Sequence, residues 1–319
     1  ADDPQEVFVS GNYACVSERS NTSLEIVDVS DPAHPATAGN YPVPGFAQGL
    51  HVLDSYAYVT YPRTTGGSRS ALRILDVSDP ADIAQKAIYG GEAVEIDISG
   101  PYAYVVNQAT SGSDHDGFGL RVINIVEPEH PREVGFYDTP GVAYDVFVAE
   151  PYAYVADGTS LQIIDISDAG TPRYAGAYDP PSCAQTGVFV SGSYAYVLAS
   201  NGLRVVDVSD PSQPDLVGNE GTGGTDIVVS GQHAYVPYGD GLRVLDVSDP
   251  AHPHEVGFCH GHAATGVAVS GSYAYLAGGD TFWVADVSDP ESPAKRGSYS
   301  VGGATAVYVS GSRAYVTAN

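Results

Sequence analysis

The 319-residue sequence is poor in several residue types that would define a class of protein. It has no Met, one Trp and three Cys (Cys15, Cys183 and Cys259), an odd and small number that cannot supply a disulfide framework. It contains no run of about 18 apolar residues, so we expect no membrane-spanning segment and a soluble chain. The Ala-Asp-Asp-Pro start without Met indicates N-terminal trimming after signal-peptide removal, which favours an extracellular or cell-surface location.

Basic residues are also scarce, because 13 Lys and Arg stand against 39 Asp and Glu, a formal net charge of −26. Such a chain repels the backbone of a nucleic acid, so we expect no nucleic-acid partner, and an anionic membrane surface is disfavoured for the same reason. The length and the 43% content of hydrophobic residues are sufficient for a sizeable core, which excludes a disordered chain.

The sequence contains two repeated motifs. Leu-Glu-Ile-Val-Asp-Val-Ser-Asp-Pro and its variants occur seven times, starting at Leu24, Leu72, Leu120, Leu161, Leu203, Leu242 and Phe282. A motif of the type Ser-Gly-x-Tyr-Ala-Tyr-Val occurs eight times, around Tyr13, Tyr56, Tyr102, Tyr152, Tyr194, His233, Tyr273 and Arg313.

Each repeat divides into four short runs of β-branched and aromatic residues, for example 225–230, 233–236, 242–247 and 255–259. Such runs are typical of strands, and Ser-Gly and Ser-Asp-Pro are typical of the turns between them. Repeats of about 40 residues with four strands predict an all-β fold, a β-propeller of four-stranded antiparallel blades in one domain over residues 1–319. A β-solenoid is the alternative. We expect the repeated turn carboxylates to be architectural: Asp28, Asp76, Asp165, Asp207, Asp246 and Asp286.

The runs Leu203-Arg-Val-Val-Asp-Val-Ser-Asp-Pro and Leu161-Gln-Ile-Ile-Asp-Ile-Ser resemble the LVIVD repeat, which is similar in pattern to YVTN-type surface propellers. The resemblance extends over essentially the whole chain. It implies an extracellular or cell-surface β-propeller of bacteria or archaea, with no catalytic motif to carry over. Two copies depart from the pattern, Asn124-Ile-Val-Glu-Pro and Ser167-Asp-Ala.

The two motifs differ in number, with eight inner hairpins and seven outer ones. This difference predicts eight blades of which the last holds only its two inner strands; seven blades with a spare hairpin are the alternative. An incomplete blade exposes an unpaired strand edge. We hypothesise that strand addition completes it, from a C-terminal stretch, a neighbouring copy or another protein.

Functional residues of propellers concentrate in loops at the mouth of the central channel. The loops 17–23, 61–70 and 107–119 are long in the first three repeats and carry Arg19, Arg63 and Arg69. Arg side chains bind carboxylate or sulfate groups bidentately, so an acidic glycan is a candidate ligand; solvated loop residues are the alternative. Asp114 and Asp116 resemble part of a calcium loop.

Cys259-His-Gly-His262 combines a thiol with two imidazoles, so His260 and His262 are candidate ligands of a transition metal. In the aligned repeats, Cys259 and Cys15 each occupy a tyrosine position, which predicts that both are small core residues. We therefore predict no cofactor, with calcium or a transition metal as alternatives.

An acidic column lies at the start of the innermost strand, and its carboxylates are expected to surround the channel mouth and hold a cation or water: Glu6, Glu95, Asp145 and Asp226. Two residues further along, His51 and Asp97 interrupt an apolar column. A polar residue in such a column needs a partner, so we predict that these two face each other as a structural or a general acid–base pair.

These patterns favour a non-enzymatic extracellular binding or assembly protein, with contacts at the loops of blades 1–3 and at the open edge of the last blade. Its partner is expected to be a protein, a neighbouring subunit or a glycan. The alternative is a lyase or hydrolase that acts on a polysaccharide at the channel mouth through His51, Asp97 and Tyr144. Metal storage or electron transfer through Cys259, His260 and His262 is the third hypothesis.

Overall fold

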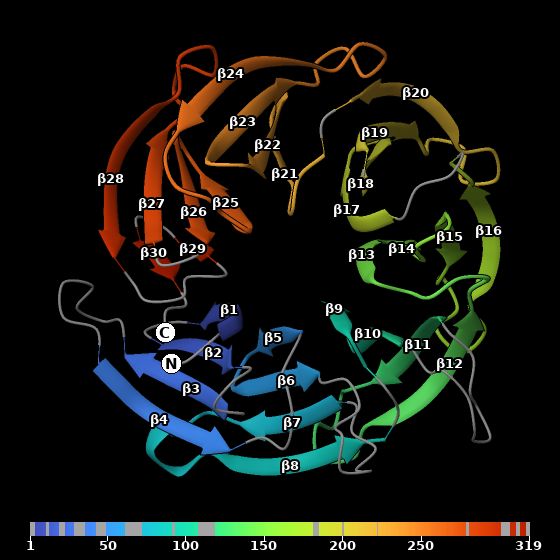
Figure 1. Ribbon diagram of the computed structural model, residues 1–319. Helices are drawn as coiled ribbons and strands as arrows, with labels where there is room; N and C mark the ends of the chain where they lie inside the picture. Colours follow the sequence, from blue (N-terminus) through green and yellow to red (C-terminus); the bar gives the residue numbers. More distant parts are fainter. Residues whose placement is uncertain are drawn as a thin grey trace. The chain divides into compact units, whose positions relative to one another are not determined.

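The computed structural model describes residues 4–10, 13–18, 23–28, 36–42, 49–60, 72–90, 93–107, 119–180, 185–199, 201–221, 223–278, 281–300, 307–310 and 313–316. Apart from one short 3-10 helix, η1 (Pro80–Asp82), the regular elements of this part are all β-strands (Figure 1).

The strands form antiparallel sheets in which the strand order follows the sequence. The first sheet contains β1 (Pro4–Ser10), β2 (Tyr13–Glu18), β3 (Ser23–Asp28) and β4 (Ala36–Pro42). The second contains β5 (Leu50–Leu53), β6 (Tyr56–Thr60), β7 (Leu72–Asp76) and β8 (Ala84–Tyr89). The third contains β9 (Glu95–Ser99), β10 (Tyr102–Asn107), β11 (Gly119–Asn124) and β12 (Arg132–Asp138). The fourth contains β13 (Asp145–Ala149), β14 (Tyr152–Ala156), β15 (Leu161–Asp165) and β16 (Arg173–Tyr178).

The remaining sheets repeat this order. The fifth contains β17 (Gln185–Ser191), β18 (Tyr194–Ala199), β19 (Gly202–Asp207) and β20 (Asp215–Glu220). The sixth contains β21 (Val228–Ser230), β22 (His233–Tyr238), β23 (Gly241–Asp246) and β24 (His254–His260). The seventh contains β25 (Gly266–Ser270), β26 (Tyr273–Gly278), β27 (Thr281–Asp286) and β28 (Ala294–Ser300). In the described part of the chain, the eighth consists of β29 (Val307–Ser310) and β30 (Arg313–Val316).

The strand register agrees with the alignment of the repeats. The first residue of the Leu motif pairs with a fourth-strand Tyr, as in Leu120 with Tyr137 and Leu161 with Tyr178. In the sixth sheet, Leu242 pairs with Cys259, so this cysteine occupies the tyrosine position, as predicted.

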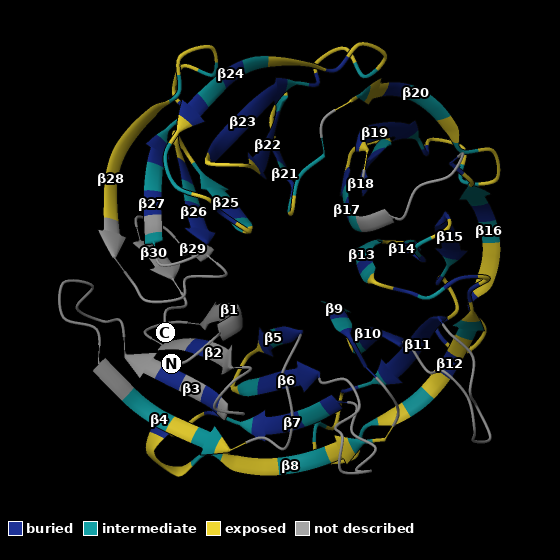
Figure 2. Ribbon diagram, in the orientation of Figure 1, coloured by how far each residue is buried: buried dark blue, intermediate teal, exposed yellow. Residues whose placement is uncertain are grey.

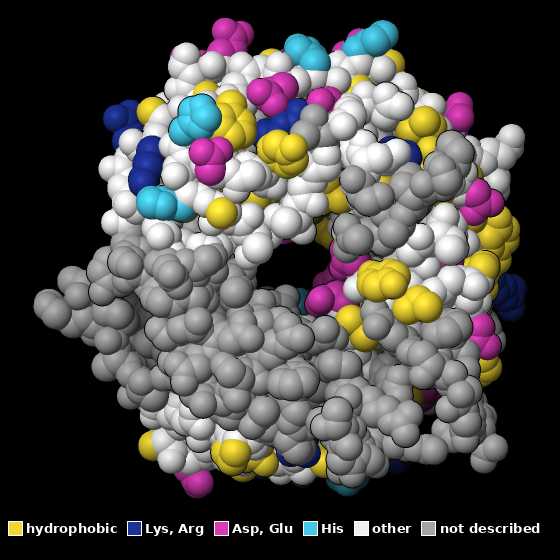
Figure 3. Space-filling model, viewed as in Figure 1, with side chains coloured by type: hydrophobic (Ala, Val, Ile, Leu, Met, Phe, Trp, Pro, Cys, Tyr) yellow, Lys and Arg dark blue, Asp and Glu magenta, His cyan; other side chains and the backbone are white. Residues whose placement is uncertain are grey.

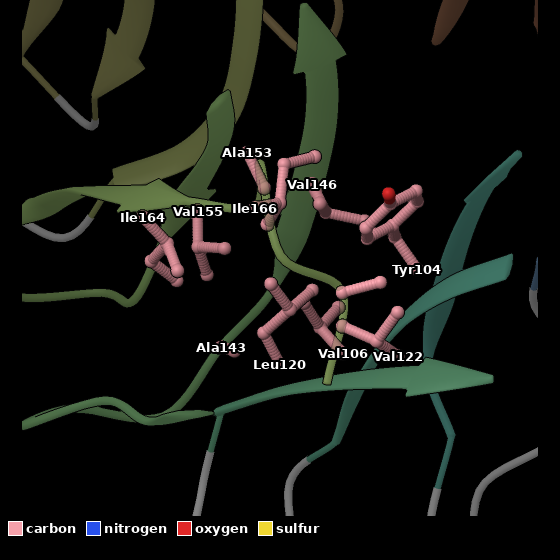
Figure 4. Close-up of a cluster of buried hydrophobic side chains, with 11 residues drawn as sticks. Tyr104, Val106, Leu120, Val122, Ala143, Val146, Ala153, Val155, Ile164 and Ile166 are labelled. Atoms are coloured by element: carbon pink, nitrogen blue, oxygen red, sulfur yellow. The ribbon is translucent and has the colours of Figure 1, made fainter. Parts of the chain in front are cut away.

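The chain falls into two compact units, which are described separately: Ala1–Ala57, Asp76–Ala84 and Gly224–Asn319 form the first, and Tyr58–Leu75 and Gln85–Gly223 the second. In the second unit, first strands of successive sheets are neighbours, β9 beside β13 and β13 beside β17. Side chains of the third and fourth sheets pack between them, with Leu120 and Val122 close to Val146 and Val155 (Figure 4). The prediction of one domain stays a prediction.

The same packing joins the sixth and seventh sheets of the first unit. Leu242 and Val244 share a core cluster with Leu276 and the fully buried Trp283. The second and third strands of the sheets are mostly buried, whereas fourth strands such as β12 and β16 carry exposed residues (Figure 2). Each sheet therefore buries its faces against neighbouring sheets and leaves its outermost strand in contact with solvent.

The outer turns confirm the architectural role of the repeated Asp. The Asp207 carboxylate accepts the Ser209 N–H at 2.8 Å, and Asp210 accepts the Ser212 N–H at 3.0 Å. Hydrogen bonds from the Ser209 and Ser212 side chains, and then those from their N–H groups, lower the pKa of the Asp207 and Asp210 carboxyl groups. In the copy that departs from the motif, Asn124 Oδ1 accepts the Val126 N–H at 3.0 Å, so an amide replaces the carboxylate in the same turn.

The eighth sheet confirms the prediction of an incomplete last blade. Its first strand, β29, contacts both β25 and β1 in the first unit. The hairpin thus takes the place of a blade between the seventh and first sheets. It is not the spare hairpin of the alternative with seven blades.

Candidate functional site

Three of the predicted acidic side chains connect neighbouring sheets. Asp145, on β13, accepts the N–H of the next residue, Val146, at 2.8 Å through Oδ1 and the N–H of Val188, on β17, at 2.9 Å through Oδ2. One carboxylate therefore holds the first strands of the fourth and fifth sheets together.

Asp226 and Asp97 repeat this geometry. Asp226 accepts the Ile227 N–H at 2.7 Å and the Val267 N–H of the seventh sheet at 2.9 Å. Asp97 accepts the N–H groups of Ile98 and of Val148 in the fourth sheet, both at 2.8 Å. Burial raises the pKa of Asp97 and of Asp226, against the lowering effect of these hydrogen bonds.

Acidic side chains gather in the second unit where β9 and β13 lie (magenta in Figure 3). Glu95, the first residue of β9, accepts the Ile96 N–H at 3.1 Å. Within the described ranges, no three His, Cys, Asp or Glu side chains are placed to hold a metal ion. Cation binding at the predicted acidic column stays a prediction. The hydrogen bonds described above for these carboxylates are with backbone N–H groups.

Replacement of Asp226 by Asn tests the raised pKa of this carboxyl group. The folded protein binds the Asp226 proton more tightly than the unfolded chain does, because burial raises its pKa above the ordinary 3.8. The stabilisation that results is present at pH values below the pKa that Asp226 has in the unfolded chain, and it is lost as the pH rises through the pKa that Asp226 has in the folded protein. We therefore expect the Tm of the wild type relative to Asp226→Asn to increase as the pH falls from about 7 to about 4. Thermal unfolding of both proteins across this range is the measurement, and a difference that shrinks toward acid pH contradicts the assignment.

His51 is half-buried on β5, and burial lowers its pKa to about 4. Its imidazole is therefore neutral at neutral pH, which is unfavourable for a general acid there. His51 and Asp97 belong to different units, so their predicted pairing stays a prediction. Tyr144, the third residue of the enzyme hypothesis, is 43% exposed, and its ring lies against the turn at Gly158.

The two candidate histidines have different neighbours. His260 is exposed and its Nδ1 lies 3.8 Å from Asp240 Oδ1, whereas Nε2 of His262 lies 2.7 Å from Lys295 Nζ. The ammonium group donates to the imidazole and so occupies Nε2 of His262, one of the two ring nitrogens through which a histidine can bind a metal. Cys259 and Cys15 are buried free thiols, and burial raises the pKa of both, that of Cys15 to about 12, as expected of core cysteines.

The other predicted site residues cannot be assigned contacts. Arg19, Arg63, Arg69, Asp114 and Asp116 lie outside the described residues. Glu6 lies in β1, but its side chain also falls outside what the structure describes. The anion and calcium sites predicted for these residues stay predictions.

A glycine column in the fourth strands was missed by the sequence analysis, although the aligned repeats contain it. A Cβ at these glycines would overlap the backbone carbonyl oxygen of the outer turn of the next sheet. The pairs are Gly39 with Pro80, Gly135 with Ala169, Gly176 with Pro211 and Gly257 with Pro290. Because glycine has no side chain, each of these positions leaves a space into which the turn of the following sheet fits, and we call this space a socket.

The socket at Gly297 differs from these four. Gly297 pairs with Val284 in the same register, but it is exposed, and a Cβ there would have no atom within 4 Å. The sheet that follows consists of β29 and β30 and has no outer turn in the part that the structure describes. We call Gly297 together with the free side of β30 the open outer position.

The fold and its relatives define the class of protein. The computationally designed Ika8 protein matches with a TM-score of 0.74 at 12% identity, over 99% of this chain and 93% of that one. BamB from Moraxella catarrhalis matches with a TM-score of 0.68 at 14% identity, over 98% and 91%. The periplasmic gluconolactonase PpgL from Pseudomonas aeruginosa matches with a TM-score of 0.66 at 13% identity, over 82% and 86%. The chain is a β-propeller.

The repeats define the family. The LVIVD repeat matches residues 2–43, 44–89, 90–139, 140–180, 185–222, 223–260 and 261–301, and the chain belongs to the LVIVD-repeat family. None of the curated proteins matches the sequence. In the described ranges, no helix has the length and apolar character needed to cross a membrane.

Proposed function

We propose that this chain is a non-enzymatic binding propeller that accepts an outer β-hairpin of a partner protein at the open outer position. The observation that carries the proposal is that, among the residues that the structure describes, the last sheet has two strands where each of the other seven has four. A free strand edge offers N–H and C=O groups that bind a further strand through backbone hydrogen bonds.

The Gly297 socket indicates which kind of strand fits. At Gly39, Gly176 and Gly257, the equivalent socket receives the carbonyl of a proline in an Asp-Pro turn. An incoming hairpin with the same turn would bury the Gly297 face in the same way. The expected partner is therefore a hairpin of the LVIVD type, supplied by another copy or by a related propeller.

The contacts of the acidic residues favour binding over catalysis. Asp97, Asp145 and Asp226 each accept two backbone N–H groups, one of them from the next sheet. These contacts give the carboxylates a role in holding sheets together. The enzyme hypothesis needs Asp97 as an acid or base, and both of its carboxylate oxygens already accept backbone N–H groups.

Binding of a synthetic outer hairpin tests the proposal. A labelled peptide of residues 202–220, which form β19, the Asp-Pro turn and β20, should bind the 319-residue chain saturably in fluorescence anisotropy. Gly297→Ala should weaken binding by about tenfold or more, because the Cβ meets the turn carbonyl of the docked peptide. Gly90→Ala is the matched control, since Gly90 is also exposed with no atom within 4 Å of a Cβ, and it should bind like the wild type.

Two results would count against hairpin binding. One is the lack of saturable binding by the wild type, and the other is equal affinity of the wild type and Gly297→Ala. A peptide in which Asp210 and Pro211 are replaced by Ala should bind more weakly, because the turn loses its cap and its fixed φ.

We further propose an extracellular or cell-surface location for this propeller. The acidic composition and the family support it, and one of the similar structures is a periplasmic gluconolactonase. Fractionation of cells that express the full-length gene, followed by immunoblotting, is the test. A signal confined to the cytoplasm contradicts this location.

A further inference from the structure

One end of the sixth sheet carries several aromatic side chains on a single face. Tyr238 and His260 both pair with Gly241. Arg243, two residues further along β23, pairs with Phe258. Residues that lie directly opposite each other, or two apart on one strand, share a face of the sheet. The rings of Tyr238, Phe258 and His260 therefore project from the same face.

Gly241 allows these rings to lie close together. A Cβ at Gly241 would lie 2.6 Å from the Phe258 ring, so this ring covers the glycine. The centres of the Phe258 and His260 rings are 4.7 Å apart, and the two rings meet edge to face. We call Tyr238, Phe258 and His260, together with Asp240 of the neighbouring turn, the aromatic platform.

The aromatic platform is open to solvent. Tyr238 is 47% exposed, Asp240 and His260 are exposed, and Phe258 is half-buried. In Figure 3, hydrophobic, His and acidic side chains gather on the visible face over β22, β23 and β24. A ligand could therefore reach the rings without any movement of the sheet.

The backbone holds the aromatic platform in place. Gly239 and Asp240 form the turn between β22 and β23, and the φ of Gly239 is +58°, as expected in a tight hairpin turn. The Asp240 carbonyl accepts the Gly261 N–H at 2.9 Å, which ties this turn to the end of β24. Groups held in this way lose little conformational entropy when a ligand binds.

The aromatic platform is not a general feature of the repeat. Arg121 and Arg204 occupy the position of Arg243 in the third and fifth sheets, so the arginine is repeated. The positions of the three rings differ: they hold Asn107, Phe136 and Asp138 in the third sheet, Ala199 and Asn219 in the fifth, and Gly278 and Ser298 in the seventh. Fold alone therefore does not account for three rings in the sixth sheet.

The charges around the rings favour a neutral ligand. The Arg243 guanidinium lies 5.7 Å from the centre of the Tyr238 ring, and its Nε lies 2.6 Å from Glu255 Oε2. A cationic ligand would compete with this guanidinium for the Tyr238 ring. An anionic ligand would be repelled by the carboxylates of Asp240 and Glu255 and by the net charge of −26.

We infer that the aromatic platform binds a neutral pyranose unit of a glycan. A pyranose has C–H groups on the faces of its ring, which pack against aromatic side chains, and hydroxyl groups around its edge. These hydroxyls can donate to the Asp240 carboxylate and form hydrogen bonds with the His260 imidazole. The site lies in the first unit on the sixth sheet, and it does not depend on hairpin binding at the open outer position.

Saturation-transfer difference NMR of the 319-residue chain with methyl β-glucopyranoside and methyl β-galactopyranoside tests the inference. At least one of these sugars should bind with a Kd of about 1 mM, the affinity expected for a ligand of this size. Two charged probes should bind more weakly. One is methyl β-glucuronopyranoside, which has a carboxylate at C6, and the other is choline, a cation that aromatic rings recognise.

Two variants and a control locate the binding site. Tyr238→Ala should weaken binding of the neutral sugar by about fivefold or more, because an aromatic surface for the sugar ring is lost. His260→Ala should also weaken it. Phe136→Ala is the matched control and should leave binding unchanged, since Phe136 is likewise 47% exposed and occupies the position of Phe258 in the third sheet.

Three results would overturn the inference. The first is that neither neutral sugar binds, and the second is that choline or the glucuronide binds more tightly than both neutral sugars. The third is that Tyr238→Ala and Phe136→Ala bind the sugar equally well. Should Tyr238→Ala fail to fold, His260→Ala, which removes an exposed imidazole, decides in its place. Binding of only one of the two neutral sugars would support the inference.

Discussion

We expect Asp157→Ala to lower the free energy of unfolding by about 3 kcal/mol or more, since each buried donor left without a partner costs about 1–3 kcal/mol. Asp157 is fully buried next to the β14–β15 turn. Its Oδ1 accepts the Thr159 N–H at 2.9 Å, the Thr159 hydroxyl at 2.8 Å and the Ser160 N–H at 2.5 Å, and its Oδ2 accepts the Gly141 N–H at 3.1 Å. One carboxylate thus joins this turn to the connection that leads into β13.

Asp157→Asn is the matched control. The amide keeps one oxygen for the donors at Thr159 and Ser160, but its NH2 group faces the Gly141 N–H, so we expect a smaller loss of about 1–2 kcal/mol. Urea unfolding of the three proteins at neutral pH gives both values. Equal losses in the two variants, or a loss below about 1 kcal/mol in Asp157→Ala, would show that the hydrogen bonds do not carry this stability.

The network has a local consequence for Tyr144. The Tyr144 N–H donates to the Ala156 carbonyl at 2.8 Å, and its ring lies against Gly158, whose φ of +75° belongs to the left-handed region. A side chain at position 158 would be strained by this φ and would collide with the ring. The turn that the Asp157 carboxylate stabilises therefore also fixes the exposed ring of Tyr144, directly before Asp145.

The sequence predicted the parts of the fold that repeat within each sheet. Strand order, the position of Cys259 opposite Leu242 and the Asp-based outer turns all follow from contacts between residues close in the sequence or paired in one sheet. The amide of Asn124 could even be read as a substitute cap, since Asn and Asp form the same side-chain turn.

Contacts between sheets could not be predicted from the sequence. The Asp145 bond to Val188 spans 43 residues, and nothing within one repeat indicates which backbone N–H a carboxylate will meet in the next. The surroundings of Arg204 could not be predicted either, because the sequence Leu-Arg-Val contains both Arg204 and Arg243. The two arginines differ in a residue of the neighbouring strand, since the fifth sheet has Leu216 where the sixth sheet has Glu255.

The glycine column leads to the second large effect, a contrast between Gly257 and Gly297. We expect Gly257→Ala to cost about 2–3 kcal/mol of unfolding free energy, because its Cβ would overlap the Pro290 carbonyl oxygen, a backbone atom that moves only together with its turn. Gly297→Ala introduces the same methyl group in the same register without a neighbour, so we expect a change within about 0.5 kcal/mol.

Urea unfolding with and without saturating hairpin peptide distinguishes the filled socket from the open one. Without peptide, only Gly257→Ala should be destabilised, and similar losses in both variants would mean that the Gly297 face is already covered. With peptide at about 100 times its Kd, the wild type should gain about 2.7 kcal/mol from binding to the folded state alone. Gly297→Ala should gain much less under the same conditions, because the added methyl group turns an open socket into one that the carbonyl of an incoming turn cannot enter.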